Sequence, residues 1–521
     1  MINRRTMLAG TAATLALAAA PVSAKSDPVV NTAEGRLRGT HEGGLSVFRG
    51  IRYGEDTSRV RFQPPIPAKP WTGVRDALSF GPVCPQRGDR YAPEREDCLF
   101  LNVWTPGLDA EAKRPVMVYF HGGAYSTGSV TDPLNDGSYL AARGDVVVVT
   151  VNHRLNAFGY LYLAGLDARF ADSGNVGQLD LILALQWIKR NIAAFGGDAS
   201  HVMVFGQSGG GAKIATLMGM PAAKGLFHAA ATMSGQQVTA QGAMNGTART
   251  RAYMAALGLG DGDVGKLLTL PTEALVEALH ATDPILGKSV YFGPTLDMKW
   301  MDRHPFWPDA NPQSTAIPMI LGNTHDETRA FISPDGDKVR GLNWDNIAAW
   351  LGPELKIDLP PDWVVAQYRD HFPDYSAEQV FYAATTAGRS WPGQVIEADA
   401  RAVAGAKDTW VYQLDFPSPV EPRRGAFHTH DIPLVFGTLG AEGSLTGTGT
   451  DARAVSEKMM DAFIALARNG NPNHAGMTEW PSYTLPDRAT MVFDAHTRAV
   501  NDPRKWQREL FARAPYIQPG S

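Results

Sequence analysis

His201-Val202-Met203-Val204-Phe205-Gly206-Gln207-Ser208-Gly209-Gly210 is the stretch that decides the fold. A strand-like apolar run leads into a serine between glycines, and residues 211–218 (GAKIATLM) place apolar side chains at helical spacing. Strand, sharp turn and helix in this order are typical of a nucleophile elbow, whose flanking glycines tolerate the strained backbone. A helix that begins at the serine directs its amides toward an oxyanion formed there. The stretch predicts Ser208 as a nucleophile, with a helix N-cap serine as the alternative.

Three further stretches offer partners for such a serine. Residues 114–120 (RPVMVYF) end in 121–125 (HGGAY), a turn of the kind whose backbone amides form an oxyanion hole. An acidic pair ends residues 322–327 (GNTHDE), and two histidines lie within 425–433 (GAFHTHDIP). Serine, acid and histidine in this chain order match the triad of α/β-hydrolases.

At this point the chain resembles the type-B carboxylesterase/lipase family, the cholinesterase-like branch of the α/β-hydrolases. The resemblance covers nearly all of the chain after its first 24 residues. Its motifs, in order, are 35–39 (GRLRG), 48–53 (FRGIRY), 61–65 (RFQPP), 96–104 (EDCLFLNVW), 151–155 (VNHRL), 191–198 (NIAAFGGD), Gly470 with Asn471, and 480–483 (WPSY).

The resemblance implies a fold and a mechanism. The fold is α/β, with a mostly parallel central sheet, helices on both faces and helical insertions. The catalytic residues are Ser208, Glu327 and His428, which hydrolyse carboxylic esters through an acyl-enzyme without metal or organic cofactor. The oxyanion hole comes from the backbone amides of Gly123, Ala124 and Gly209.

Each triad position has rivals in the sequence. Asp326 competes with Glu327 for the acid, and the family pattern favours Glu327. His430, His325 and His153 compete with His428 for the base. The family position is His428. The H-x-H pair is also expected to lie on an extended segment with its two rings on opposite faces, so that only one ring faces the serine. His325 and His153 are then structural histidines.

The chain departs from the family pattern at four positions. Gln207 replaces the usual Glu, Gly209 the usual Ala, Ala124 a third glycine and His153 the usual Tyr. None of these changes removes a catalytic group. Loss of the negative charge beside Ser208 predicts that choline esters are poor substrates, whereas moderately bulky neutral esters are accepted.

Other functions receive less support. Amide or lactone hydrolysis by the same triad is the nearest alternative, and a non-catalytic binding protein of the same family would carry a broken triad. The net charge of −5 and the absence of a basic stripe, a phosphate-binding motif and an internal repeat argue against nucleic acids and nucleotides. The expected partner is a small ester.

The N-terminus predicts an export signal over residues 1–24. Arg4 and Arg5 precede an Ala-rich apolar run, and Val22-Ser23-Ala24 offers small residues for cleavage. Paired arginines before a mild apolar run are typical of a twin-arginine signal. A membrane anchor is the alternative, but the run is shorter than the ~20 residues that span a bilayer. We expect an exported, periplasmic or secreted protein without stable membrane association, in which residues 25–521 form one catalytic domain.

The two cysteines, Cys84 and Cys98, fall where the family carries its N-terminal disulfide. The resemblance and an oxidising compartment together predict that they are bonded. A metal site is the weaker alternative, since two thiols need further ligands and no nearby histidine pair supplies them.

Hydrophobic patterns predict the remaining organisation. Residues 144–151 and 408–414 are expected as strands, and Leu181 to Ile192 as a helix with one apolar stripe. Residues 342–406 are predicted to form a helical insertion that helps shape the pocket. The Gly/Thr-rich residues 437–450 form either a rim beside His428 or a plain surface loop.

Overall fold

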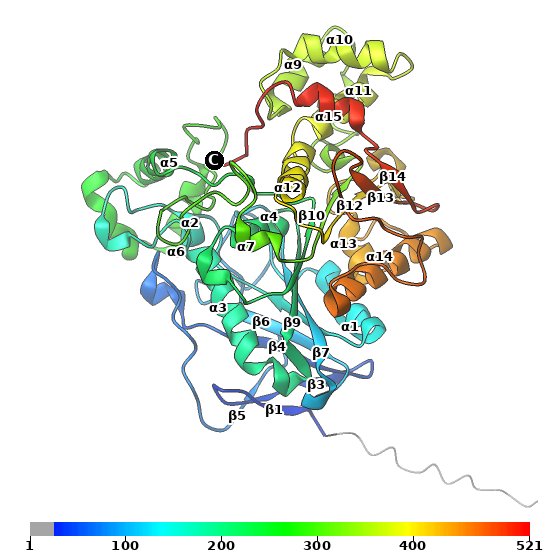
Figure 1. Cartoon of the computed structure of the whole chain (residues 1–521). Coiled ribbons are helices and arrows are strands. Elements are labelled where there is room, and N and C mark those ends of the chain that lie inside the picture. The colour runs from blue at the N-terminus through cyan, green and yellow to red at the C-terminus, as the bar shows by residue number, and fades with distance from the viewer. Residues whose placement is uncertain (1–25) are drawn as a thin grey trace, which may run out of the picture.

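The computed structural model describes residues 26–521, and its centre is a single large β-sheet. The predicted leader, residues 1–24, lies outside the described residues. Eleven strands form this sheet in the order β14-β13-β12-β11-β10-β9-β7-β8-β6-β4-β3 (Figure 1). From β8 to β13 neighbouring strands run parallel, and antiparallel strands close both edges. This confirms the predicted α/β fold with a mostly parallel sheet.

The strands of the large sheet are β3 (Thr40–Glu42), β4 (Leu45–Arg52), β6 (Phe100–Thr105), β7 (Arg114–Phe120), β8 (Val147–Val151), β9 (Gly197–Gln207), β10 (Ala229–Met233), β11 (Met319–Thr324), β12 (Thr409–Leu414), β13 (Ala489–Phe493) and β14 (Arg498–Asn501). A separate small sheet joins β1 (Val29–Asn31), β2 (Arg36–Arg38) and β5 (Val74–Asp76).

The helices are α1 (Ser138–Gly144), α2 (Asn156–Tyr160), α3 (Val176–Asn191), α4 (Gly209–Met218), α5 (Ala243–Ala256), α6 (Thr272–Glu277), α7 (Pro312–Thr315), α8 (Asp337–Arg340), α9 (Ile347–Leu351), α10 (Pro361–His371), α11 (Ala377–Ala387), α12 (Trp391–Val403), α13 (Asp431–Phe436), α14 (Thr450–Asn469) and α15 (Lys505–Phe511).

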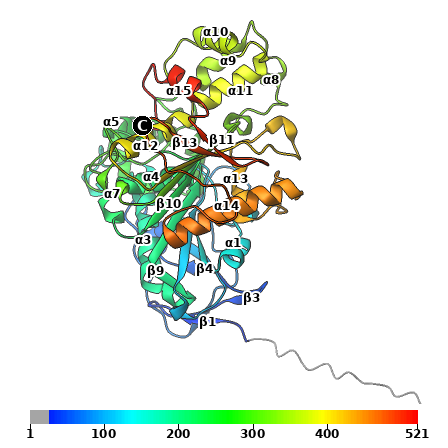
Figure 2. The ribbon, with the colours of Figure 1, turned by 45° about the vertical axis from the view of Figure 1, so that its right-hand side comes forward.

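Two hydrophobic cores flank the sheet because its central strands are buried on both faces. On β7, Val116 and Val118 pack into the core under α3 and α4, whereas Met117 and Tyr119 pack into the core under α1 and α14. Figure 2 shows α3 on one side of the sheet and α1 and α14 on the other. Alternate side chains of one strand therefore pack into opposite cores, which explains why the sequences of these strands are continuously apolar.

The predicted elements are found, with shifted ends. The run 144–151 begins as a strand only at Val147, because Gly144 ends α1 and Asp145 takes a left-handed conformation (φ 43°) that caps it. The helix predicted from Leu181 is α3, which starts earlier, at Val176. Residues 342–406 contain α9 to α12, and these helices share a core with α15 above the sheet (Figure 1). The predicted helical insertion is confirmed.

Candidate active site

Ser208 lies on a sharp turn between β9 and α4. Its backbone has φ 55° and ψ −124°, a strained conformation for a residue with a side chain. The neighbouring glycines permit this turn. A Cβ on Gly210 would lie 1.9 Å from the carbonyl oxygen of Phe120, and one on Gly206 would lie 2.6 Å from the backbone of Gly210. Strand, turn and helix pack too closely here for any larger residue.

His428 and Glu327 meet beside this turn. Glu327 follows β11, and His428 lies in the loop after β12. Nδ1 of His428 hydrogen-bonds to one carboxylate oxygen of Glu327, and both residues are buried. The other oxygen accepts from the backbone N–H of Thr324 at 2.9 Å and from the side-chain amide of Asn323 at 3.1 Å. A fixed carboxylate thus holds the histidine ring in one orientation.

The pKa of Glu327 lies below its usual range. Burial alone would raise this pKa, but the charge of His428 and the hydrogen bonds from His428 and Thr324 outweigh it. Glu327 is therefore an anion at neutral pH. An anion that accepts from Nδ1 leaves Nε2 of the neutral imidazole as an acceptor that can take a proton.

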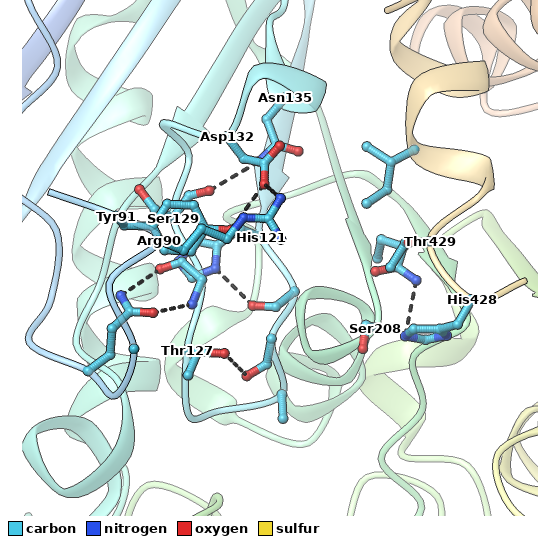
Figure 3. Close-up of a pocket in the computed structure, with 18 of the residues that line it drawn as sticks. Arg90, Tyr91, His121, Thr127, Ser129, Asp132, Asn135, Ser208, His428 and Thr429 are labelled. Atoms are coloured by element: carbon cyan, nitrogen blue, oxygen red, sulfur yellow. Dashed lines mark hydrogen bonds and ion pairs between the residues drawn. The ribbon is translucent and has the colours of Figure 1, made fainter. Parts of the chain in front are cut away.

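Nε2 of His428 faces the cavity that Ser208 also lines (Figure 3). Its hydrogen-bond neighbour is the side-chain amide of Gln207 at 3.2 Å, and within residues 26–521 no hydrogen bond joins Ser208 and His428 directly. Sequence reasoning treated Gln207 only as a lost charge. Its contact with His428 could not be predicted from the sequence, because Gln207 ends β9 and His428 lies on a loop far along the chain.

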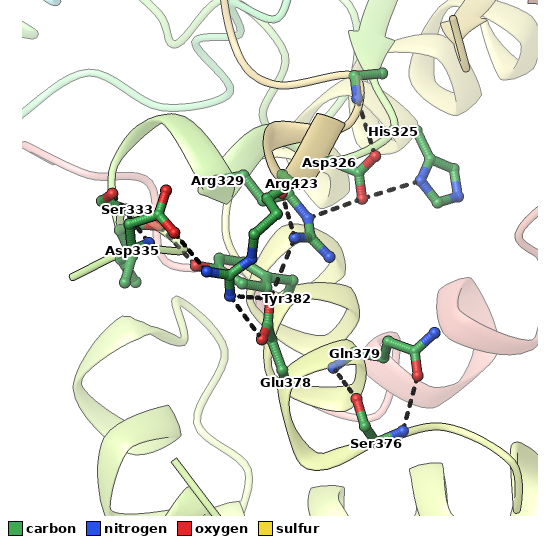
Figure 4. Close-up of polar contacts among 12 residues, drawn as sticks. His325, Asp326, Arg329, Ser333, Asp335, Ser376, Glu378, Gln379, Tyr382 and Arg423 are labelled. Carbon is green, nitrogen blue, oxygen red and sulfur yellow. Dashed lines mark hydrogen bonds and ion pairs between the residues drawn. The ribbon is translucent and has the colours of Figure 1, made fainter. Parts of the chain in front are cut away.

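The rival acid is engaged elsewhere. Asp326 accepts from the backbone N–H of Ala426 at 3.0 Å and lies 3.4 Å from the ring of His325 and 3.4 Å from the guanidinium of Arg329 (Figure 4). Adjacent side chains at the end of β11 thus point to opposite sides. Only Glu327 contacts His428.

The rival bases are also placed apart from Ser208. His430 is buried against Phe427 with a ring distance of 4.8 Å, and neither of its ring nitrogens has a hydrogen-bond partner among the described residues. Burial lowers the pKa of His430 to about 4. The expected geometry of the H-x-H pair is wrong in two ways. Residues two apart on an extended segment would share one face, and the segment is not extended, because Thr429 has φ 80° and α13 begins at Asp431. The turn at Thr429 is what separates the two rings.

His153 and His325 have structural surroundings. His153 is buried and stacks on His121 with ring centroids 4.6 Å apart, and burial lowers its pKa well below the usual range. The side chain of His325 is half exposed beside Asp326. Neither residue lines the cavity at Ser208.

The turn after β7 approaches the serine from the opposite side. Gly123 has φ 82° and Ala124 has φ 55°. Across the described part of the chain, the backbone N–H groups of Gly123, Ala124 and Gly209 make no hydrogen bond with the protein. A Cβ on Gly209 would lie 2.0 Å from the carbonyl oxygen of Ala124. The turn conformation therefore leaves no room for an alanine at 209.

The cavity above Ser208 has a volume of about 650 Å³. One end holds Ser208, His428 and the turn at Gly123 and Ala124, and the other end is polar. Polar side chains of that end include Gln86, Tyr91, Glu94, Ser129, Asp132 and Asn135. Residues 437–450 connect α13 and α14 and none of them lines this cavity, so they form the plain surface loop rather than the rim.

Lys213 is a buried residue whose role sequence reasoning missed. It lies on α4 directly beneath the elbow, and its ammonium donates to the backbone carbonyl of His121 at 3.1 Å. No carboxylate pairs with it within the described chain, and burial lowers its pKa to about 7. A lysine among the apolar residues of this helix was the available signal.

Cys84 and Cys98 are both buried, and the structure holds them as free thiols. The expected disulfide is therefore not formed in it. The thiol of Cys84 accepts from the backbone N–H of Leu155 at 3.2 Å, and a hydrogen bond from Cys84 together with burial raises the pKa of Cys98 well above its usual range. The two side chains are adjacent, as the family resemblance implies.

Neither a metal cluster nor a membrane helix is found in residues 26–521. No group of three or more His, Cys, Asp or Glu side chains there could hold a metal ion. No helix in the same range is long and apolar enough to cross a membrane.

Known proteins match the sequence of this chain over almost its whole length. The model of the carboxylesterase family matches residues 26–511. The para-nitrobenzyl esterase of Bacillus subtilis is 35% identical over 497 residues, which cover 92% of this chain and 98% of the relative. The phenmedipham hydrolase of Pseudarthrobacter oxydans is 33% identical over 89% of this chain and 94% of its own.

Solved structures agree with the fold. The crystal structure of a carboxylesterase from Geobacillus stearothermophilus superposes with a TM-score of 0.81 at 35% identity, covering 93% of this chain and 99% of its own. The match includes the central sheet and its helices.

Proposed function

The chain belongs to the carboxylesterase family and is a carboxylic ester hydrolase of type B; from this we propose that Ser208, His428 and Glu327 form its catalytic triad. One observation carries the proposal. Nδ1 of His428 is held by the buried carboxylate of Glu327 while Nε2 faces the cavity that contains Ser208. These are the positions that a base and its orienting acid need.

Acylation begins with the proton of the Ser208 hydroxyl. Nε2 of His428 takes this proton while the serine oxygen attacks the ester carbonyl, and the alcohol leaves with a proton returned from the imidazolium. Water then attacks the acyl-enzyme by the same route and releases the acid. Glu327 stabilises the imidazolium in both steps without itself becoming protonated.

The negative oxygen of each tetrahedral intermediate faces the free amides. Those of Gly123, Ala124 and Gly209 are the candidates, because they make no hydrogen bond within the described chain and lie at the elbow. Removing one such donor typically costs a factor of about 10² to 10³ in kcat. Main-chain donors explain why the substitutions at 124 and 209 are compatible with activity.

The test is labelling and replacement of the serine. A fluorophosphonate should modify Ser208 alone, and Ser208→Ala should abolish hydrolysis of 4-nitrophenyl butyrate while the thermal unfolding midpoint stays near that of the wild type. Ser129→Ala is the matched control, because Ser129 lines the same cavity. Wild-type turnover in Ser208→Ala would reject the triad.

We also propose that the chain is exported through its paired arginines, and that Cys84 and Cys98 become bonded in the oxidising compartment. Support comes from the leader sequence and from the adjacent buried thiols. Thiol titration of denatured protein from the periplasmic fraction, without reductant, tests both: no free thiol is expected.

A further inference from the structure

Arg389 is a cation inside the catalytic cavity. It lies between α11 and α12 of the helical insertion and lines the same cavity as Ser208. Its guanidinium lies 4.4 Å from the ring centre of Phe331, and that ring lies 4.8 Å from the ring of His428. One aromatic side chain thus separates a permanent positive charge from the proposed base.

The guanidinium of Arg389 lacks hydrogen-bond acceptors. None of its N–H groups donates a hydrogen bond to any residue in the described part of the chain, and its ion-pair neighbour, Glu354, is 3.6 Å away. The Glu354 carboxylate is shared, because Lys338 lies 3.3 Å from it. A guanidinium has five N–H donors in a planar fork that fits a carboxylate. Arg389 is only 28% exposed, so its donors are largely shielded from water yet open to the cavity.

A second arginine of the cavity shows the contrast. Arg90 donates to the carboxylate of Asp132 at 2.7 Å, and Tyr91 donates to the same oxygen at 3.0 Å. The positive charge of Arg90 is therefore matched by a hydrogen-bonded carboxylate, whereas Arg389 shares the carboxylate of Glu354 with Lys338 and donates no hydrogen bond to it.

Positive charge also exceeds negative charge around Arg389. Lys288, Lys338 and Arg389 together lower the pKa of Glu354, although burial alone would raise it. Burial and the repulsion from Arg389 and Lys288 lower the pKa of Lys356. Four cationic side chains therefore surround one carboxylate in a protein whose net charge is −5. Of these four, Arg389 is the one that lines the cavity.

We propose that Arg389 selects esters that carry an additional carboxylate, and that it binds this group while the ester carbonyl lies at Ser208. The proposal rests on the proposed function, since it assigns the substrate class of the same site. The cavity of about 650 Å³ has room for such a molecule. The carboxylate can belong to the acyl part or to the alcohol part of the ester.

Two substrate pairs distinguish these sources. In the first, 4-nitrophenyl glutarate is compared with 4-nitrophenyl valerate, so that only the acyl part gains a carboxylate. In the second, 3-carboxyphenyl butyrate is compared with phenyl butyrate, so that only the alcohol part gains it. We expect the anionic member of one pair to have the higher kcat/KM, by about tenfold, as a charge-assisted hydrogen bond provides. Added salt should reduce this preference.

Variants assign the preference to Arg389. Arg389→Met should abolish the preference for the anionic ester, so that the anionic and neutral esters of each pair have similar kcat/KM. Arg389→Lys should retain part of the preference, because the charge remains without the planar fork. Arg369→Met is the matched control, because Arg369 lies on α10 of the same insertion, packs on Trp344 at 4.6 Å and does not line the cavity. This control should keep the full ratio.

The outcomes separate the two proposals. If the wild type hydrolyses the neutral esters but shows no preference in either pair, or if Arg389→Lys and Arg389→Met both keep the full preference, the carboxylate proposal is overturned and the triad stands. If no ester is hydrolysed, the triad itself is rejected.

Discussion

The side-chain amide nitrogen of Gln207 lies 3.2 Å from Nε2 of His428. Nδ1 of the same ring is hydrogen-bonded to Glu327, so Nε2 of the neutral ring carries a lone pair and the amide donates to it. The amide orientation is assigned on this basis, because a carbonyl oxygen at that place would repel the lone pair. Gln207 therefore occupies the lone pair that the Ser208 hydroxyl would use in the proposed mechanism.

Replacing this donor by a carboxylate should change the pH dependence of hydrolysis. In Gln207→Glu, a negative charge beside the ring favours the protonated imidazole, which cannot accept the serine proton. We expect the acid limb of the kcat/KM profile to move to higher pH, by about one unit. The measurement is kcat/KM for a neutral ester between pH 5 and pH 9.

Gln207→Met is the control for that experiment, because it removes the hydrogen bond without adding charge. Its acid limb should stay well below that of Gln207→Glu. Coincident profiles for wild type and Gln207→Glu would show that the amide does not act on the base.

Replacing each histidine of the pair should separate their roles. His428→Ala removes the residue that contacts Glu327, so kcat should fall by a factor of about 10⁴ or more. His430→Ala leaves a cavity beside Phe427 and lowers stability, but kcat should stay within about tenfold of the wild type. Initial rates with 4-nitrophenyl butyrate decide this, and the opposite order would reassign the base.

The adjacent carboxylates give a parallel comparison. Glu327→Gln keeps the shape of the side chain but removes the anion that fixes the tautomer of His428, so a loss of about 10³ to 10⁴ in kcat is expected. Asp326→Asn weakens contacts with His325 and Arg329, which lie outside the catalytic cavity. Its kcat should remain within about tenfold. Comparable losses in both variants would argue against a single orienting acid.

Lys213 should make the stability of the fold depend on pH. Burial lowers its pKa to about 7, from an ordinary value of 10.5, so between these values the unfolded chain binds more protons. The free energy of unfolding should therefore rise between pH 7 and pH 10, by about 3 kcal/mol from this group. Lys213→Met should lack this rise.

Urea denaturation at several pH values measures that difference. Lys224→Met is the matched control, because Lys224 is exposed and follows the same helix. An equal rise in the wild type and in Lys213→Met would show that the lysine is not responsible.

Local patterns predicted the parts of the site that depend on neighbouring residues. The elbow at Ser208 follows from a strand, glycines and a helix in direct succession, and Glu327 and His428 each follow a strand whose apolar run is plain in the sequence. Family resemblance selected Glu327 over Asp326 and His428 over His430. The geometric expectation for the histidine pair was nevertheless wrong, since residues two apart on an extended strand would share one face and it is a turn at Thr429 that separates the two rings.

Contacts between distant segments were not predictable in this way. The amide of Gln207 meets a ring on another loop, and the charge on Lys213 is buried because β7 brings the carbonyl of His121 over α4. The surroundings of the Arg389 guanidinium likewise depend on where Glu354 and Phe331 lie in three dimensions. Sequence spacing carries no information on such distances.

The order of strands in the sheet links ester turnover to the completion of folding. Ser208 follows β9, Glu327 follows β11 and His428 follows β12. Strand β12 pairs with β11 along its whole length, from the pair Met319 and Thr409 to the pair Thr324 and Leu414. A nascent chain that has not yet delivered β12 holds its serine on a finished turn and has no base for it. With the proposed triad, a chain that ends before β12 therefore lacks the base for ester hydrolysis, and turnover reports that β12 and the loop after it are in place.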